Sequence, residues 1–148
     1  MVKDIPISEI VLRKYERPYD ISRRDLVKKI CLSLGLLQPG DSRDVIVDIL
    51  QVLIDSQGKK EKLDSVEIGK RVEGLRLAEK LEIKGVAESN IRRQLKRLRD
   101  MMIIEKRENL YYLNEFETLD KIFEEKIEKF IVRPNIERIR EYLSEIEG

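Results

Sequence analysis

The chain has 148 residues, of which 40% are charged, yet its 30 basic and 29 acidic side chains nearly cancel, to a formal net charge of +1. This length suits one domain with an extension. Because the net charge is close to zero, it does not by itself indicate which kind of partner the protein binds. The absence of histidine excludes histidine-based catalysis and histidine-ligated zinc. The single cysteine, Cys31, excludes a disulfide within the chain, and its apolar helical surroundings predict a small core residue.

The chain shows neither the apolar core of a signal peptide nor the run of about eighteen apolar residues that a membrane span needs, so we expect a cytoplasmic protein.

The first forty residues predict an N-terminal helical extension, residues 1–40. Residues 3–17 are compatible with a short helix or an extended arm, and we favour the helix. Ser22 is a typical N-cap, and the helix that follows it is predicted over residues 23–34, because Gly35 favours a stop.

A nearly continuous apolar segment, residues 45–54, predicts the central helix of the next domain. Because apolar side chains cover most of its circumference, other elements must surround it. Asp41 or Ser42 is the expected N-cap. Asp44 and Asp48 lie one helical turn apart and could share a divalent ion, but such carboxylates more often face solvent, so no metal site is predicted.

The segment before the basic helix leaves two alternatives open. Asp64 or Ser65 can cap a helix that begins SVEIGKRV. In one alternative, residues 66–72 form the scaffold helix and residues 74–84 are an insertion. In the other, LRLAEKLEI forms that helix, with Ala78 as its small packing residue.

Residues 88–102 predict an amphipathic helix with one cationic face. Apolar residues recur at steps of four, three and four, which keeps one side of an α-helix apolar. They are Ile91, Leu95, Leu98 and Met102. The opposite side carries Ser89, Arg93, Lys96, Arg97 and Asp100. Residues 84–107 contain eight basic and three acidic side chains, a local excess that suits a nucleic-acid face, although charges also cluster on solvated helices.

After residue 101 the spacing becomes that of strands. Residues 110–113 are rich in strand-forming side chains, and Glu108 and Asn109 can form a tight hairpin turn, because Asn tolerates a positive φ. Together, SNIRRQLKRLRDMMIIEKRENLYYL resembles the recognition helix and wing of winged helix-turn-helix DNA-binding proteins, many of them bacterial and archaeal transcription regulators. This resemblance, over residues 41–114, implies a mostly α fold: a winged helix-turn-helix domain with a small two-stranded wing, plus N-terminal and C-terminal helical extensions.

An α-helix of about 10 to 12 Å diameter fits the major groove of DNA, so the cationic face defines the predicted site. Arg93 is predicted to read a base, since a guanidinium can donate two hydrogen bonds to guanine. Asn90 can pair with adenine or contact phosphate, and the other cations of the helix are expected to bind phosphates. The resemblance places the wing tip at the minor groove or adjacent backbone. The predicted DNA-binding residues are Ser89, Asn90, Arg92, Arg93, Lys96, Arg97, Lys106, Arg107 and Asn109.

The last segment, residues 115–148, predicts a C-terminal helical arm in which Pro134 breaks the helix. One apolar stripe precedes the proline and another follows it. The first is Phe116, Leu119, Ile122, Phe123, Ile127 and Phe130, and the second is Ile136, Ile139, Leu143 and Ile146. Such helices carry more apolar surface than a small domain covers, so we expect a homodimer, with a monomer whose helices fold back as the alternative.

The sequence therefore predicts a protein that binds double-stranded DNA, as a transcriptional regulator. Catalysis is not expected, because GKKEK and GKRVE lack the spacing of a phosphate-binding loop, and no cofactor is predicted. The alternative is a winged-helix protein-interaction module within a larger DNA- or RNA-handling assembly. In that case the cations of residues 88–102 would pair with acidic groups of neighbouring helices.

Overall fold

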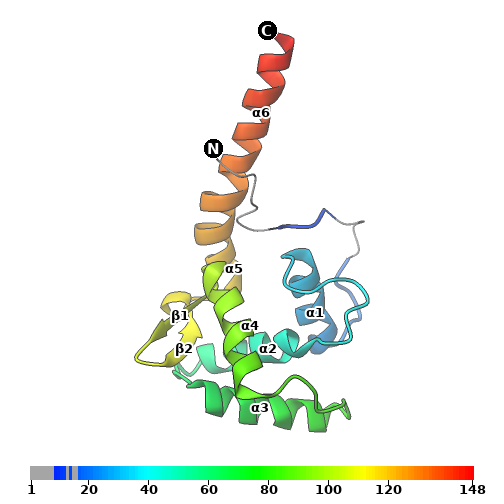
Figure 1. The fold of residues 1–148 in the computed structure, drawn as a ribbon, viewed down its shortest axis with the longest axis vertical. Helices are drawn as coiled ribbons and strands as arrows, with labels where there is room; N and C mark the ends of the chain where they lie inside the picture. Colours follow the sequence, from blue (N-terminus) through cyan, green and yellow to red (C-terminus); the bar gives the residue numbers. More distant parts are fainter. Residues whose placement is uncertain (1–8, 13, 15–16) are drawn as a thin grey trace.

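The computed structural model describes residues 9–12, 14 and 17–148. The elements are α1 (Arg23–Ser33), α2 (Val45–Gln57), α3 (Ser65–Ala78), α4 (Glu88–Asp100), β1 (Ile104–Arg107), β2 (Leu110–Leu113), η1 (Asn114–Phe116), α5 (Leu119–Ile122), η2 (Phe123–Val132) and α6 (Arg133–Glu147). Figure 1 shows a body made of α1 to α4 and the hairpin, from which α6 projects. The prediction of a mostly helical fold with a small two-stranded antiparallel sheet is confirmed.

The N-terminal extension contains one helix, α1. Its predicted cap is confirmed, because the Ser22 hydroxyl accepts a hydrogen bond of 3.1 Å from the Asp25 N–H. The described residues before position 18 (9–12, 14 and 17) are not helical, so the favoured N-terminal helix is wrong there, and its other residues lie outside the described part. The reason is visible at Val11, whose N–H donates to the Ser33 carbonyl across the end of α1 instead of to a helical neighbour.

The central helix of the body is α2, as predicted. Residues 45–50 are all buried, because α1, α3, α4 and β2 pack around this helix. Its N-cap is Asp44, not Asp41 or Ser42, and the Asp44 side chain makes no capping hydrogen bond. That carboxylate accepts hydrogen bonds from two arginines instead, as described below.

The segment for which two alternatives remained folds as a single helix, α3. Asp64 caps it, accepting a hydrogen bond of 2.8 Å from the Glu67 N–H. The helix includes residues 66–72 and only the first four residues of LRLAEKLEI, and it ends at Ala78, so neither alternative was fully correct. α3 packs against α2 and α4, and a connection with Gly85 at φ +72° leads into α4.

The two strands form the predicted hairpin. Ile104 pairs with Leu113, and the turn residues Glu108 and Asn109 have positive φ values of 52° and 65°, as a two-residue hairpin turn requires. Leu63, just before α3, forms an antiparallel bridge with Tyr111 of β2. Strand β2 is therefore tied to the chain that enters α3.

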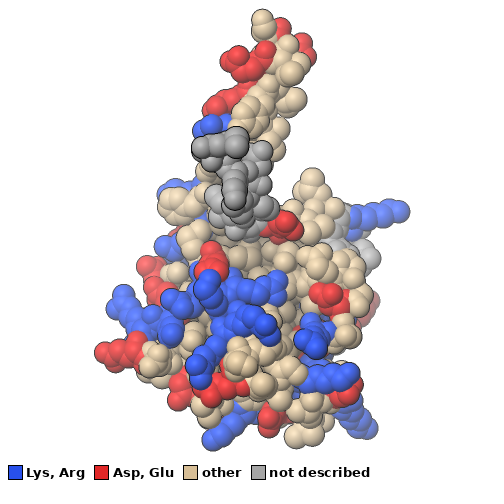
Figure 2. All heavy atoms as spheres, viewed as in Figure 1, with Lys and Arg blue, Asp and Glu red and all other residues tan. Residues whose placement is uncertain are grey.

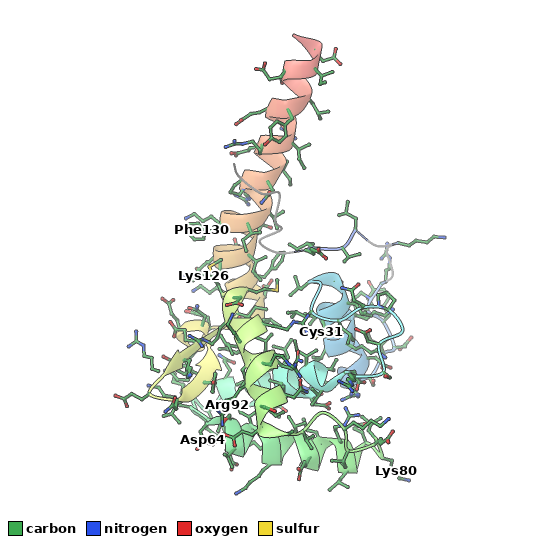
Figure 3. All side chains as sticks on the ribbon, in the orientation of Figure 1. Cys31, Asp64, Lys80, Arg92, Lys126 and Phe130 are labelled. Atoms are coloured by element: carbon green, nitrogen blue, oxygen red, sulfur yellow. The ribbon has the colours of Figure 1, made fainter. Side chains whose placement is uncertain are left out.

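The C-terminal arm is one continuous helical rod from Leu119 to Glu147, so the predicted break at Pro134 is wrong (Figure 1). The segment before the proline, η2, is a wider helix in which the Arg133 N–H bonds to the Glu128 carbonyl five residues back. Such a widened segment accommodates Pro134, because proline has no N–H to donate and its ring would otherwise clash with the carbonyl of the preceding turn. Every residue of α6 is exposed, and Figure 3 shows its side chains projecting away from the body.

One hydrophobic cluster includes residues of α1, α2, α3, α4 and the base of the rod. Cys31 belongs to this cluster and is fully buried, as predicted. The predicted domain boundaries, which separate residues 1–40, 41–114 and 115–148, stay a prediction. Residues of α1 and of the rod belong to the same hydrophobic cluster as α2, α3 and α4. Within the described ranges, no helix has the length and apolar character to cross a membrane.

Candidate nucleic-acid interface

The apolar side of α4 is buried as the sequence spacing predicts. Ile91, Leu95 and Leu98 are fully buried against the core. Met102 does not continue this stripe, because α4 ends at Asp100 and Met102 has a positive φ of 63°, beyond the helix. Met101 is buried in its place. The opposite side of α4 is therefore fixed toward solvent.

The exposed side of α4 carries the predicted cations. In Figure 2, Lys and Arg side chains gather over the region that Figure 1 assigns to α4 and the hairpin. The Arg93 guanidinium donates to Asn90 Oδ1 and the Arg97 guanidinium to Gln94 Oε1, each at 2.8 Å. Both acceptors are neutral amides, so these hydrogen bonds orient the guanidiniums without cancelling their charges.

The remaining cations of this side pair only with their own helix. Arg92 lies 2.6 Å from Glu88, and Lys96 lies 3.2 Å from Asp100. The hydrogen bond from Arg92, with a second from Ser65, holds the pKa of Glu88 below its ordinary value. Exposed pairs of this kind contribute little to stability and are screened by salt. Among the described residues, no carboxylate of another element is within ion-pair distance of the cations of this face.

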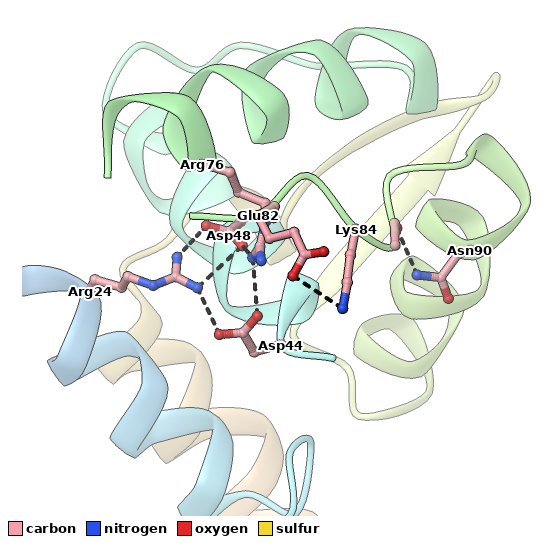
Figure 4. A network of polar contacts seen from close by, with 8 residues as sticks. Arg24, Asp44, Asp48, Arg76, Glu82, Lys84 and Asn90 are labelled. Atoms are coloured by element: carbon pink, nitrogen blue, oxygen red, sulfur yellow. Dashed lines mark hydrogen bonds and ion pairs between the residues drawn. The ribbon is translucent and has the colours of Figure 1, made fainter. Parts of the chain in front are cut away.

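Asn90 occupies a different position from the other predicted residues. It is half-buried, and its Nδ2 donates to the Gly85 carbonyl at 2.7 Å (Figure 4). This bond fixes the connection that enters α4. Asn90 Oδ1 also accepts hydrogen bonds from Arg93 and Gln94, so both ends of this amide have partners within the protein, whereas the neighbouring Ser89 is exposed at the first turn of the helix.

The hairpin lies beside α4 and presents the other three predicted residues. Lys106, Arg107 and Asn109 are all exposed at or near its turn. Lys106 Nζ lies 5.7 Å from the centre of the Tyr111 ring, within the range of a cation–π contact. Contacts between α4 and β1 hold the two elements together, so all nine predicted residues belong to two neighbouring elements.

The sequence analysis missed one cation of this region, Arg43. A hollow of about 270 Å³ lies between the loop before α2 and α4, and Arg43, Arg93 and Arg97 are among its lining residues. Arg43 makes no hydrogen bond or ion pair within the described ranges. No sequence signal pointed to it, because it lies in a loop far from α4 along the chain and only the fold brings the two together.

A buried ionic network supports this arrangement (Figure 4). Arg76 Nη1 lies 2.7 Å from Asp48 and 3.1 Å from Asp44, and its Nε donates to the Glu82 carbonyl at 2.7 Å. Arg24 Nη2 lies 3.0 Å from Asp44, and Arg24 Nη1 also bonds to Asp48. Asp48 is fully buried and Arg76 nearly so. The network thus joins α1, α2 and α3.

The network corrects the expectation that Asp44 and Asp48 face solvent. Their partners are two arginines from helices far apart in the sequence, which periodicity within α2 could not reveal. Burial alone would raise the pKa of Asp44, but hydrogen bonds and charge from Arg76 and Arg24 outweigh it and hold that pKa below its ordinary value. No group of three or more potential metal ligands occurs in the part of the chain that the structure describes.

Compared with known proteins, the chain matches no family model, no curated protein and no solved structure. The interpretation of the cationic surface therefore depends on its geometry and chemistry.

Proposed function

We propose that the protein binds double-stranded DNA, with α4 in the major groove and the hairpin as a wing on the adjacent minor groove or backbone. The observation that carries this proposal is the exposed trio of Arg93, Lys96 and Arg97, whose charges no other described element neutralises. Burial of the opposite side of α4 keeps the trio outward. Cationic groups on a rigid helix supply the phosphate contacts on which DNA affinity mainly depends.

The arrangement of the elements supports a winged helix-turn-helix assignment. α3 and α4 pack against each other and against α2, and the hairpin follows α4 directly. The bridge between Leu63 and Tyr111 ties the hairpin to the chain that enters α3. A wing held on the same core as the recognition helix can contact DNA at a fixed distance from it.

Within this proposal the site residues have separate roles. Arg93 reads a base edge, and Arg92, Lys96 and Arg97 bind phosphates. Ser89 contacts the backbone near the start of the helix, and Asn90 acts mainly by fixing the entry into α4. The hairpin contributes Lys106, Arg107 and Asn109.

The function that fits best is that of a transcriptional regulator, acting as a cytoplasmic homodimer and without enzymatic activity. One observation favours a second candidate, a winged-helix protein-interaction module in a DNA- or RNA-handling assembly. The apolar side chains of α6 are exposed, and such a surface needs a protein partner. A homodimer supplies that partner without a second protein.

Selection of bound fragments from a pool of random duplexes tests the proposal. The wild-type protein should enrich a defined sequence, and the triple variant Arg93→Ala, Lys96→Ala, Arg97→Ala should enrich none. A charge-matched control replaces three exposed lysines outside the interface, Lys59, Lys70 and Lys80, and should enrich the same sequence as the wild type. Failure of the wild type to retain any duplex would favour the protein-interaction module.

A further inference from the structure

The hollow between α4 and the loop before α2 brings three arginines together. Arg43 comes from the loop, Arg93 and Arg97 come from α4, and all three line a space of about 270 Å³, which we call the arginine hollow. Arg43 has no hydrogen bond or ion pair within the described part of the chain. Guanidiniums gathered around one space repel one another, and an anion between them removes that repulsion.

The two arginines of α4 are held in place by neutral groups. Arg93 donates to Asn90 Oδ1 and Arg97 to Gln94 Oε1, each at 2.8 Å, and Arg97 also lies 3.5 Å from the Gly35 carbonyl. Gln94 Nε2 in turn donates to Asn90 Oδ1 at 3.2 Å. The four side chains of α4 therefore form one hydrogen-bonded row, in which the guanidiniums are oriented but keep their full charge.

The acidic lining of the hollow does not balance these charges. Among the described residues that line it, Asp41 is the one with a carboxylate. Its Oδ2 accepts a hydrogen bond of 3.0 Å from the Gln38 N–H, within its own loop, and Asp41 makes no ion pair with another described residue. Three arginines and one aspartate leave an excess of two positive charges around the hollow.

Neighbouring carboxylates reduce this excess little. Asp44 and Asp48 bond to two arginines in the buried network, whose charges therefore sum to zero. Glu82 pairs with Lys84 at 3.1 Å. Glu9, whose backbone lies against Gly35, is exposed and makes no ion pair with the hollow's arginines. Salt screens an exposed carboxylate of this kind.

The charge and the donors suit a phosphate group. A phosphate monoester carries roughly 1.5 to 2 negative charges near pH 7, which matches the excess better than the single charge of a carboxylate. Guanidiniums donate paired hydrogen bonds to phosphate oxygens. Val45 and Ile46, the first residues of α2, also line the hollow, and the positive end of the helix dipole adds to the attraction of the arginines.

We propose that the arginine hollow binds a phosphate group through Arg43, Arg93 and Arg97 together. Two sources can present this group: a small phosphate or phosphomonoester in solution, and the backbone of a DNA duplex. The second source rests on the proposed function, since Arg93 and Arg97 belong to the DNA-binding face. A small phosphate in the hollow takes up these two arginines and therefore competes with the duplex.

Isothermal titration calorimetry with inorganic phosphate, at constant ionic strength and without DNA, tests the first source. The wild type should bind phosphate saturably. Arg43→Ala should raise the dissociation constant at least about tenfold, because a hydrogen bond between charged groups is lost. The matched control, Arg140→Ala, removes an exposed arginine of α6 and should leave the constant unchanged. Both variants should keep the helical circular dichroism of the wild type, because both side chains are exposed.

The salt dependence of duplex binding, in a phosphate-free buffer, tests the second source. Loss of one backbone contact in Arg43→Ala should make the slope shallower by about 0.9, and Arg140→Ala should not change it. Competition is tested in the same assay. Inorganic phosphate that binds the hollow should weaken duplex binding at constant ionic strength, more in the wild type than in Arg43→Ala.

A phosphate affinity or a duplex slope that depends on Arg43 supports the site and identifies the source of the phosphate. The proposal is overturned when Arg43→Ala changes neither quantity, including the case in which phosphate binds the variant as tightly as the wild type. Duplex binding that survives this result leaves the proposed function standing. Conversely, a wild type that binds phosphate through Arg43 but retains no duplex would reject the proposed function and leave the arginine hollow as a site for small phosphates.

Discussion

Arg76 Nη1 of α3 lies 2.7 Å from Asp48 Oδ2 of α2, and both side chains are buried. Removing one partner of such a pair leaves an uncompensated buried charge. We therefore expect Asp48→Asn to lower the free energy of unfolding by about 3 to 5 kcal/mol. Urea denaturation measures this change.

The matched control for this variant is on the same helix. Asp55 pairs with Arg23 at 2.5 Å, but both side chains are about half exposed, at 49 and 57%. Asp55→Asn should change the free energy of unfolding by less than about 1 kcal/mol. Equal losses in the two variants would contradict the structural role assigned to the buried network.

The stability of the protein should fall in acid partly because of Asp44. Its pKa in the folded protein is below its ordinary value, so below pH of about 4 the unfolded chain binds a proton more readily than the folded one. The contribution of Asp44 is therefore present above that pH and is lost as the pH falls through the folded pKa. Urea denaturation between about pH 6 and pH 2 should show a shallower acid loss for Asp44→Asn than for the wild type. Parallel curves would rule out this residue as a source of acid sensitivity.

Arg93→Ala should reduce discrimination between DNA sites. The guanidinium lies on the exposed side of α4 and is oriented by the neutral Asn90 amide. Loss of a bidentate base contact should cost about 1 to 3 kcal/mol at one base pair and less on random duplex. Fluorescence anisotropy with the selected site and its single-base variants measures the difference.

The control for Arg93 is Arg99→Ala, an exposed arginine of the same helix that lies outside the predicted site. Its removal should leave the ranking of sites unchanged. A uniform loss on all sequences for Arg93→Ala would show that Arg93 contacts phosphate only.

α4 and the hairpin could be predicted from the sequence because their signals are local. The steps of four and three between Ile91, Leu95 and Leu98 fix which side of the helix is buried, and that side is buried. Glu108 and Asn109 have the positive φ values that their turn demands. Each of these features depends on residues within a few positions of one another.

The features that the sequence did not reveal depend on distant residues or on backbone geometry. The partners of Asp48 come from α1 and α3, and charged residues without an evident partner are normally read as exposed. Arg43, in the loop before α2, lies near α4 only because α2 packs against that helix. The break expected at Pro134 did not occur, because the helix widens before the proline, and no residue pattern marks that adjustment.

The most direct test of the DNA-binding proposal is the salt dependence of binding to random duplex. Counterion release predicts that the logarithm of the affinity falls linearly with the logarithm of the salt concentration. For the triple variant Arg93→Ala, Lys96→Ala, Arg97→Ala, the slope should be shallower than that of the wild type by about 2, since the lost phosphate contacts of Lys96 and Arg97 each remove about 0.9. Wild-type affinity that does not depend on salt, or a slope that the triple variant leaves unchanged, would contradict the account.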